Sequence, residues 1–167
     1  MVQALRLLER QSHGRPPIGW DEIIVGHDFG LLEPGEIQEW VLGQAGPGPR
    51  SLELAALDGE RLAGFEAALW AACAEAAGPA PRPGGRRWAR AQDRWRAALL
   101  RDALAAPLTP EALAVAVEAI YDRVGCPEDM LGLWRLAPAW QARPADADRE
   151  AVARFVRRCE RESAAGF

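Results

Sequence analysis

The sequence predicts an all-α protein with about eight helices in a single irregular, antiparallel helical array. Apolar residues recur at spacings of three and four along almost the whole chain, which is typical of helices that bury one face. Runs in which apolar and polar residues alternate, as in half-buried strands, are absent. The chain has 167 residues, the length of one domain, and we therefore expect a single helical domain over residues 1–167.

Three short helices are expected before a glycine–proline loop at residues 46–49. Their apolar stripes lie over residues 1–8, 20–27 and 37–41. Pro34 fits the first turn of the third helix, where its missing N–H costs no hydrogen bond. A two-strand hairpin around residues 46–50 is the one place where strands would be expected. Ser51 is expected to cap a short fourth helix.

A longer helix is expected to begin at Glu60, because one apolar face continues from there at helical spacing. This face comprises Leu62, Phe65, Leu69, Ala72, Cys73 and Ala76. Prolines and glycines fill residues 78–85, and we expect them to form an exposed loop that connects two parts of the single domain.

Further helical segments follow that loop. The first carries an apolar face of Trp88, Ala91, Trp95, Ala98 and Leu99. Thr109 stands before a proline and an acidic residue, which together indicate a helix start. Pro127 is expected to open another helix that continues through Trp134, and Asp146 is expected to cap the last one. The tail at 163–167 is expected to fray.

Composition narrows the class of protein. The formal net charge of −4 makes nucleic acid an unlikely partner on electrostatic grounds. No apolar run approaches the roughly 18 residues of a membrane helix, and the N-terminus lacks a secretory signal, so we expect a cytoplasmic protein with no membrane partner. The three cysteines form no CxxC pair, so neither a disulfide framework nor a zinc site is expected. All 20 basic residues are arginine, which is typical of a GC-rich genome and does not by itself indicate anion binding.

No catalytic residue, cofactor or metal site can be assigned from the sequence. The phosphate-loop and dinucleotide-binding glycine patterns are missing. His13 is expected in a polar loop and exposed to water. His27 has Ile23 and Leu31 one turn away rather than a second ligand, so we expect it to be partly buried under its helix. A role for His27 as metal ligand or general base is the alternative.

Acidic residues between positions 21 and 39 are candidates for partner binding. They are Asp21, Asp28, Glu33, Glu36 and Glu39. One alternative is that they favour helix starts and cover solvated helix faces, and another is that paired carboxylates serve acid–base chemistry or bind a divalent ion. Trp70 falls beside its apolar stripe and Trp140 falls in a loop. If exposed, either would be an interface anchor, whereas a buried position would place it at the edge of the core.

Two segments of the chain resemble a known family. The first comprises Gly19-Trp20-Asp21-Glu22-Ile23, Gly26, Gly30-Leu31-Leu32 and Glu36-Ile37. The second comprises Ala119-Ile120-Tyr121-Asp122, Cys126-Pro127-Glu128-Asp129-Met130 and Pro138, with Arg87-Trp88 and Trp95 between the two. Together they are similar to the bacterial family called domain of unknown function 2247, over roughly residues 15 to 140. The resemblance implies a small cytosolic protein, and some relatives look like immunity partners of contact-dependent toxins.

The second of these segments predicts a corner between two helices. A glycine ends one helix, Pro127 starts the next, and the rings of Tyr121 and Trp134 are expected to pack across the turn. The fold-specifying residues would be Tyr121, Pro127, Glu128, Asp129, Met130 and Trp134. A binding role for this turn is the alternative.

Three hypotheses for function follow. The first is a protein-binding module of the toxin-immunity type, whose acidic surface captures a basic toxin domain by electrostatic steering. The second is a small-molecule-binding protein or enzyme with a pocket between helices near His27, with Asp28 or Tyr121 nearby. The third is a homodimeric scaffold that associates through an exposed tryptophan face.

Overall fold

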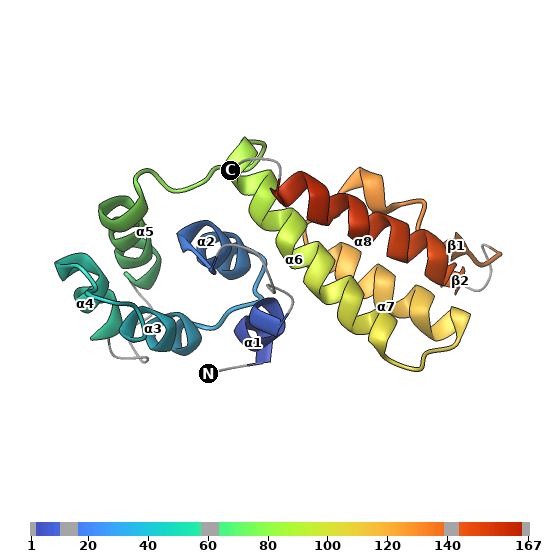
Figure 1. The fold of residues 1–167 in the computed structure, drawn as a ribbon, viewed down its shortest axis with the longest axis horizontal. Coiled ribbons are helices and arrows are strands. Elements are labelled where there is room, and N and C mark those ends of the chain that lie inside the picture. Colours follow the sequence, from blue (N-terminus) through green and yellow to red (C-terminus); the bar gives the residue numbers. More distant parts are fainter. Residues whose placement is uncertain (1–2, 11–16, 58–63, 139–143, 165–167) are drawn as a thin grey trace. The chain divides into compact units, whose positions relative to one another are not determined.

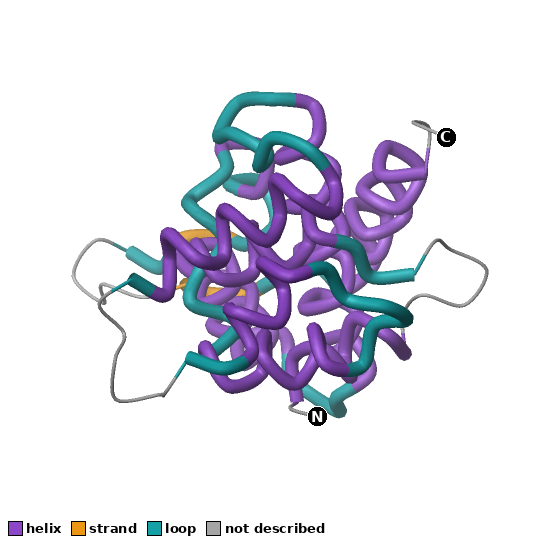
Figure 2. Tube along the Cα trace, turned by 90° about the vertical axis from the view of Figure 1, so that its left-hand side faces the viewer, coloured by secondary structure: helices purple, strands orange, loops and turns teal. Residues whose placement is uncertain are grey.

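Helices make up most of the chain in the computed structural model, which describes residues 3–10, 17–57, 64–138 and 144–164 (Figure 1). Eight α-helices, one short 3-10 helix and one two-stranded sheet occur in these residues, and the all-α fold class is confirmed. Figure 2 shows how small the share of the two strands is along the described trace. The chain forms two compact units, Met1–Ala91 (unit 1) and Gln92–Phe167 (unit 2).

The boundary between the units lies inside α6 (Arg86–Ala105). The loop expected at residues 78–85 is present and mostly exposed, but it precedes this boundary and lies within unit 1. The expectation of a single domain over residues 1–167 stays a prediction.

The described residues of unit 1 before that loop form five α-helices. They are α1 (Gln3–Arg10), α2 (Trp20–Asp28), α3 (Pro34–Leu42), α4 (Pro49–Ala55) and α5 (Phe65–Ala77). Helix α4 packs against α3 and α5, and α2 also packs against α5. The largest side chains buried here include Ile23, Ile37, Leu54 and Leu69, each with no exposed area. This apolar core holds the acidic surface helices of unit 1 in place.

The apolar face predicted for the long helix of unit 1 is largely as expected. Phe65, Leu69, Ala72 and Cys73 are buried, whereas Ala76 is exposed. The described helix begins at Phe65, and the expected start at Glu60 and the side chain of Leu62 lie outside the described residues.

Unit 2 is built from α6 and the elements that follow it. These are α7 (Pro110–Arg123), the 3-10 helix η1 (Glu128–Met130), β1 (Arg135–Leu136), β2 (Pro144–Asp146) and α8 (Arg149–Ala164). Helices α7 and α8 run antiparallel to α6 (Figure 1). The Gln92 side chain donates a 2.9 Å hydrogen bond to the carbonyl of Val124, just after α7. Arg149, at the start of α8, donates hydrogen bonds to backbone carbonyls in the last turn of α6 and in the loop before α7.

The prediction of a helix from Pro127 through Trp134 is wrong. Only the three residues of η1 are helical there, and the chain then enters a small antiparallel sheet in which Arg135 pairs with Asp146. The region around residues 46–50, where a hairpin was considered, is instead a loop followed by the start of α4. Strand pairing between distant short segments has no periodic signature over two or three residues, so the sequence could not predict this sheet.

Two predicted helix caps are also corrected. Ser51 is buried inside α4, which starts at Pro49, the position at which proline is favoured. Asp146 belongs to β2, and the cap of α8 is Asp148, whose carboxylate accepts a 2.9 Å hydrogen bond from the N–H of Glu150. The cap predicted at Thr109 is confirmed, because its hydroxyl accepts a 3.2 Å hydrogen bond from Ala112 N–H.

Candidate partner-binding surface

Negative charge is concentrated in one stretch of unit 1, although unit 1 as a whole carries a formal charge of only −3. Between Pro17 and Gly78 the sequence contains eleven acidic residues and two arginines, a formal charge of −9, although the whole chain carries only −4. The acidic cluster noticed between positions 21 and 39 is therefore part of a longer acidic stretch that continues through α5. A charge count over a window that spans several helices would have revealed this stretch.

Two of the five acidic candidates serve the fold rather than an exposed surface, which corrects that expectation. Glu36 is 5% exposed, and its Oε2 accepts a 2.8 Å hydrogen bond from Glu33 N–H at the start of α3. Asp21 is half-buried and forms a two-point ion pair with Arg87, at 2.5 Å to Nη2 and 2.9 Å to Nε. Glu22 repeats the first arrangement at α2. These carboxylates stabilise helix starts and a helix–helix contact.

The other three candidates, Asp28, Glu33 and Glu39, are exposed in unit 1. The pKa of Asp28 is raised from its ordinary value of 3.8, chiefly because partial burial disfavours the charged form. The negative charge of Glu66 raises it further, whereas His27 lowers it. Asp28 at the end of α2 and Glu66 at the start of α5 therefore lie close enough to repel each other.

Trp70 is 48% exposed on α5, next in sequence to the fully buried Leu69. The inference that it falls beside the apolar stripe is therefore correct, although its role in binding stays a prediction. Glu66 lies four residues before it, which places both side chains on the same helix face. Trp140, the other tryptophan singled out, lies outside the described residues.

His27 is half-buried, and its ring centroid lies 5.6 Å from that of Phe65. Its Nδ1 is buried, and within the described part of the chain it has no hydrogen-bond partner. His13 lies outside the described residues. Tyr121, which was considered as a companion of His27 in a pocket, lies on α7 in unit 2, where its ring contacts Trp134.

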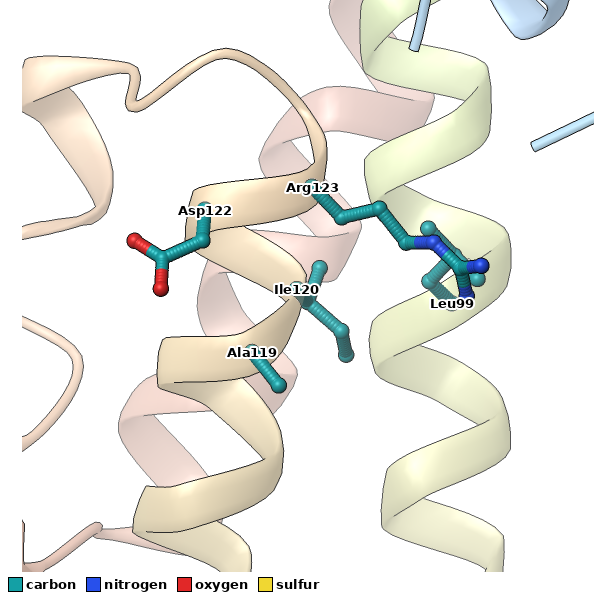
Figure 3. Close-up of a pocket in the computed structure, with 5 residues that line it drawn as sticks. All are labelled: Leu99, Ala119, Ile120, Asp122 and Arg123. Atoms are coloured by element: carbon teal, nitrogen blue, oxygen red, sulfur yellow. The ribbon is translucent and has the colours of Figure 1, made fainter. Parts of the chain in front are cut away.

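A groove in unit 2 lies between α6 and α7 and has a volume of 560 Å³. It is lined by Leu99, Ala119, Ile120, Asp122 and Arg123. In Figure 3 Ile120 and Arg123 extend toward α6, whereas Asp122 points away from it. Its lining combines three apolar side chains with one carboxylate and one guanidinium, and the carboxylate points away from α6. The hypothesis of a pocket near His27 gains no support from this groove.

The turn predicted to specify the fold packs as expected around one aromatic pair. The Tyr121 and Trp134 ring centroids are 5.3 Å apart in an edge-to-face arrangement. Gly125 has a φ of 82°, and the N–H of Cys126 donates a 3.0 Å hydrogen bond to the carbonyl of Tyr121, which closes α7 as in a Schellman motif. Met130 is fully buried, and this turn therefore forms part of the core of unit 2.

Asp129 connects this turn to two helices of unit 2. Its carboxylate accepts hydrogen bonds from Arg96 of α6 at 2.7 Å and from Arg158 of α8 at 2.6 Å. Arg96 is also paired with the buried Asp93, and the guanidinium of Arg158 lies 4.5 Å from the ring centroid of Phe155. Pro127 precedes η1 and Glu128 is exposed. Sequence reasoning placed Asp129 in the turn but missed both arginines, because neither lies near it in the chain.

Among the residues that the structure describes, no group of three or more His, Cys, Asp or Glu side chains is placed to hold a metal ion. In the same residues, no helix combines the length and the apolar character needed to cross a membrane. Comparison with known proteins found no matching family model, no matching curated protein and no matching solved structure.

Proposed function

We propose that this chain is a protein-binding module of the toxin-immunity type, and that its partner is a basic protein. The observation that carries the proposal is the formal charge of −9 between Pro17 and Gly78. Such a concentration of one sign of charge in one part of a folded unit accelerates encounter with a partner of the opposite sign. Asp28, Glu33 and Glu39 are exposed there.

The exposed Trp70 adds an anchor of the kind that dominates binding energies. Tryptophan is enriched among the few interface residues that contribute most of the affinity, whereas acidic residues at the rim mainly set the association rate. The resemblance to the domain of unknown function 2247 family supports the immunity version, because some of those relatives look like toxin-neutralising partners. We expect the protein to act in the bacterial cytoplasm, where an immunity protein would neutralise its toxin.

Affinity capture with charge-reversed variants tests this proposal. The tagged full chain is used to capture proteins from a lysate of the organism that encodes it, at low and high salt. The wild type should retain a basic protein at low salt, and the Asp28→Arg/Glu39→Arg variant should lose it. Arginine at position 28 suits the end of a helix, so the change at that position should not impair folding. Glu162→Arg, at the end of α8, is the matched control and should retain the partner.

The captured protein then decides the immunity version. Expressed alone, it should inhibit bacterial growth, and co-expression with the wild-type chain should restore growth, whereas the Asp28→Arg/Glu39→Arg variant should not. Capture of no basic protein, or capture that is indifferent to the charge reversal, would refute the proposal. A captured protein that is harmless on its own would refute the toxin-immunity assignment.

A further inference from the structure

We infer that the outward face of α5 binds an arginine-bearing segment of the partner protein, an inference that rests on the proposed function. The α5 face comprises Glu66, Trp70, Ala74 and Ala77. All four residues are exposed, and their spacings of four, four and three residues place them along one side of the helix. Trp70 is the only large apolar side chain among them, and two alanines continue the face beyond it.

Two carboxylates lie near the start of this face, Glu66 on the face itself and Asp28 at the end of α2. Helix α2 packs against α5, and the contact between the rings of His27 and Phe65 joins the end of one to the start of the other. Asp28 directly follows His27, and Glu66 directly follows Phe65, so the two carboxylates are held near each other. Neither carboxylate has an ion-pair partner in the described residues.

An arginine of the partner satisfies both features of this surface. A guanidinium stacks on the face of a tryptophan ring and at the same time donates two parallel hydrogen bonds to a carboxylate. It is also less strongly hydrated than the ammonium of lysine, so less solvation is lost on contact. A guanidinium placed over Trp70 would reach Glu66 one turn away and would relieve the repulsion between Glu66 and Asp28.

Three synthetic helical peptides of equal length test this inference. They share an alanine–leucine framework and carry arginine, lysine or glutamate at every fourth position. Calorimetric titration of the wild-type chain should give the order arginine over lysine, with no binding of the glutamate peptide. Trp70→Ala should weaken binding of the arginine peptide by about two- to fivefold and abolish the preference over lysine. Glu66→Gln should weaken binding of both cationic peptides.

Matched variants in unit 2 control for general effects of exposed residues. Leu131 is 54% exposed and the Glu162 side chain 55% exposed, so Leu131→Ala and Glu162→Gln remove comparable groups from the other unit. Both should bind the arginine peptide as the wild type does. Amide chemical shifts in an NMR titration should change along α5 and at the end of α2.

The outcomes separate this inference from the proposed function. Equal affinity for the arginine and lysine peptides, or full binding by Trp70→Ala, would overturn the inference. A native partner captured in a manner that depends on Asp28 and Glu39 but not on Trp70 would overturn the inference alone and leave the proposed function standing. Sedimentation that reveals dimers dependent on Trp70 would assign the α5 face to a second copy of the chain and would also overturn it.

Discussion

Replacement of Arg96 tests how unit 2 is held together. Arg96 and Asp93 are both 6% exposed, and their side chains form an ion pair in α6. Arg96→Met keeps most of the apolar stem, leaves the Asp93 carboxylate buried without its cation, and removes one of the two partners of Asp129. Removing one member of a buried ion pair costs about 3–5 kcal/mol. We expect the free energy of unfolding to fall by about that amount.

The pH dependence of this loss has a defined sign. Burial raises the pKa of Asp93 above its ordinary value of 3.8, whereas the hydrogen bond and the charge of Arg96 lower it. A carboxyl group whose folded pKa is raised contributes stability that is complete below the unfolded pKa and is lost as the pH rises through the folded pKa. Arg96→Met removes both lowering influences, so its deficit should be largest at neutral pH and should shrink toward about pH 4.

Urea unfolding followed by circular dichroism measures the effect. With a slope of about 2 kcal/mol per M, the midpoint should fall by about 2 M. Asp93→Leu/Arg96→Met, which leaves no unpaired buried charge in the pair, should be more stable than Arg96→Met alone. In the exposed pair of Arg157 with Glu150 the arginine is 53% exposed, and Arg157→Met should cost less than about 1 kcal/mol. A loss for Arg96→Met as small as this, or one that grows on acidification, would refute the reasoning.

Three further predictions concern packing, capping and thiol reactivity. Met130→Ala removes a fully buried side chain and should lower the free energy of unfolding in urea by about 2–5 kcal/mol. Leu136 is 78% exposed, so Leu136→Ala should leave it nearly unchanged. Similar losses for both variants would contradict the assignment of the turn to the core. Asp148→Ala removes the cap of α8 and should lower the free energy of unfolding by about 1 kcal/mol, more than Asp146→Ala does. The reverse order would restore Asp146 as the cap of this helix. Ellman's reagent at about pH 8 should label the exposed Cys126 first, because burial raises the pKa of Cys73 to about 11 and that of Cys159 to about 12. Rapid labelling of all three thiols would show that the cores are open.

Much of the helical structure could be predicted from the chain because its determinants are local. The apolar spacing around Leu69 and Cys73 indicated the buried face of α5, and Thr109 indicated the start of α7. The errors occurred where a local signal had two meanings. Pro127 can open a long helix or a single 3-10 turn, and the choice depends on whether Met130 and Trp134 find space in a core.

The candidate surface was predicted less completely, for a related reason. The acidic residues between positions 21 and 39 could be identified in the sequence, and so could the position of Trp70 beside the apolar stripe of its helix. The sequence did not reveal that Glu36 would turn back to the N–H of Glu33, because an acidic residue in the first helical turn can also remain in solvent. Nor did it show that Asp28 would lie near Glu66, which depends on how α2 packs against α5.

The sequence by itself determined the all-α class, most of the helix positions and the concentration of negative charge between Pro17 and Gly78, because periodicity and charge are properties of neighbouring residues. Only the tertiary structure decided which charges are used internally. Asp21 meets Arg87 across 66 positions, and Asp129 meets Arg96 and Arg158 across 33 and 29. Ion pairing falls steeply with distance and depends on burial, and both quantities are set by the packing of segments that are remote in the chain.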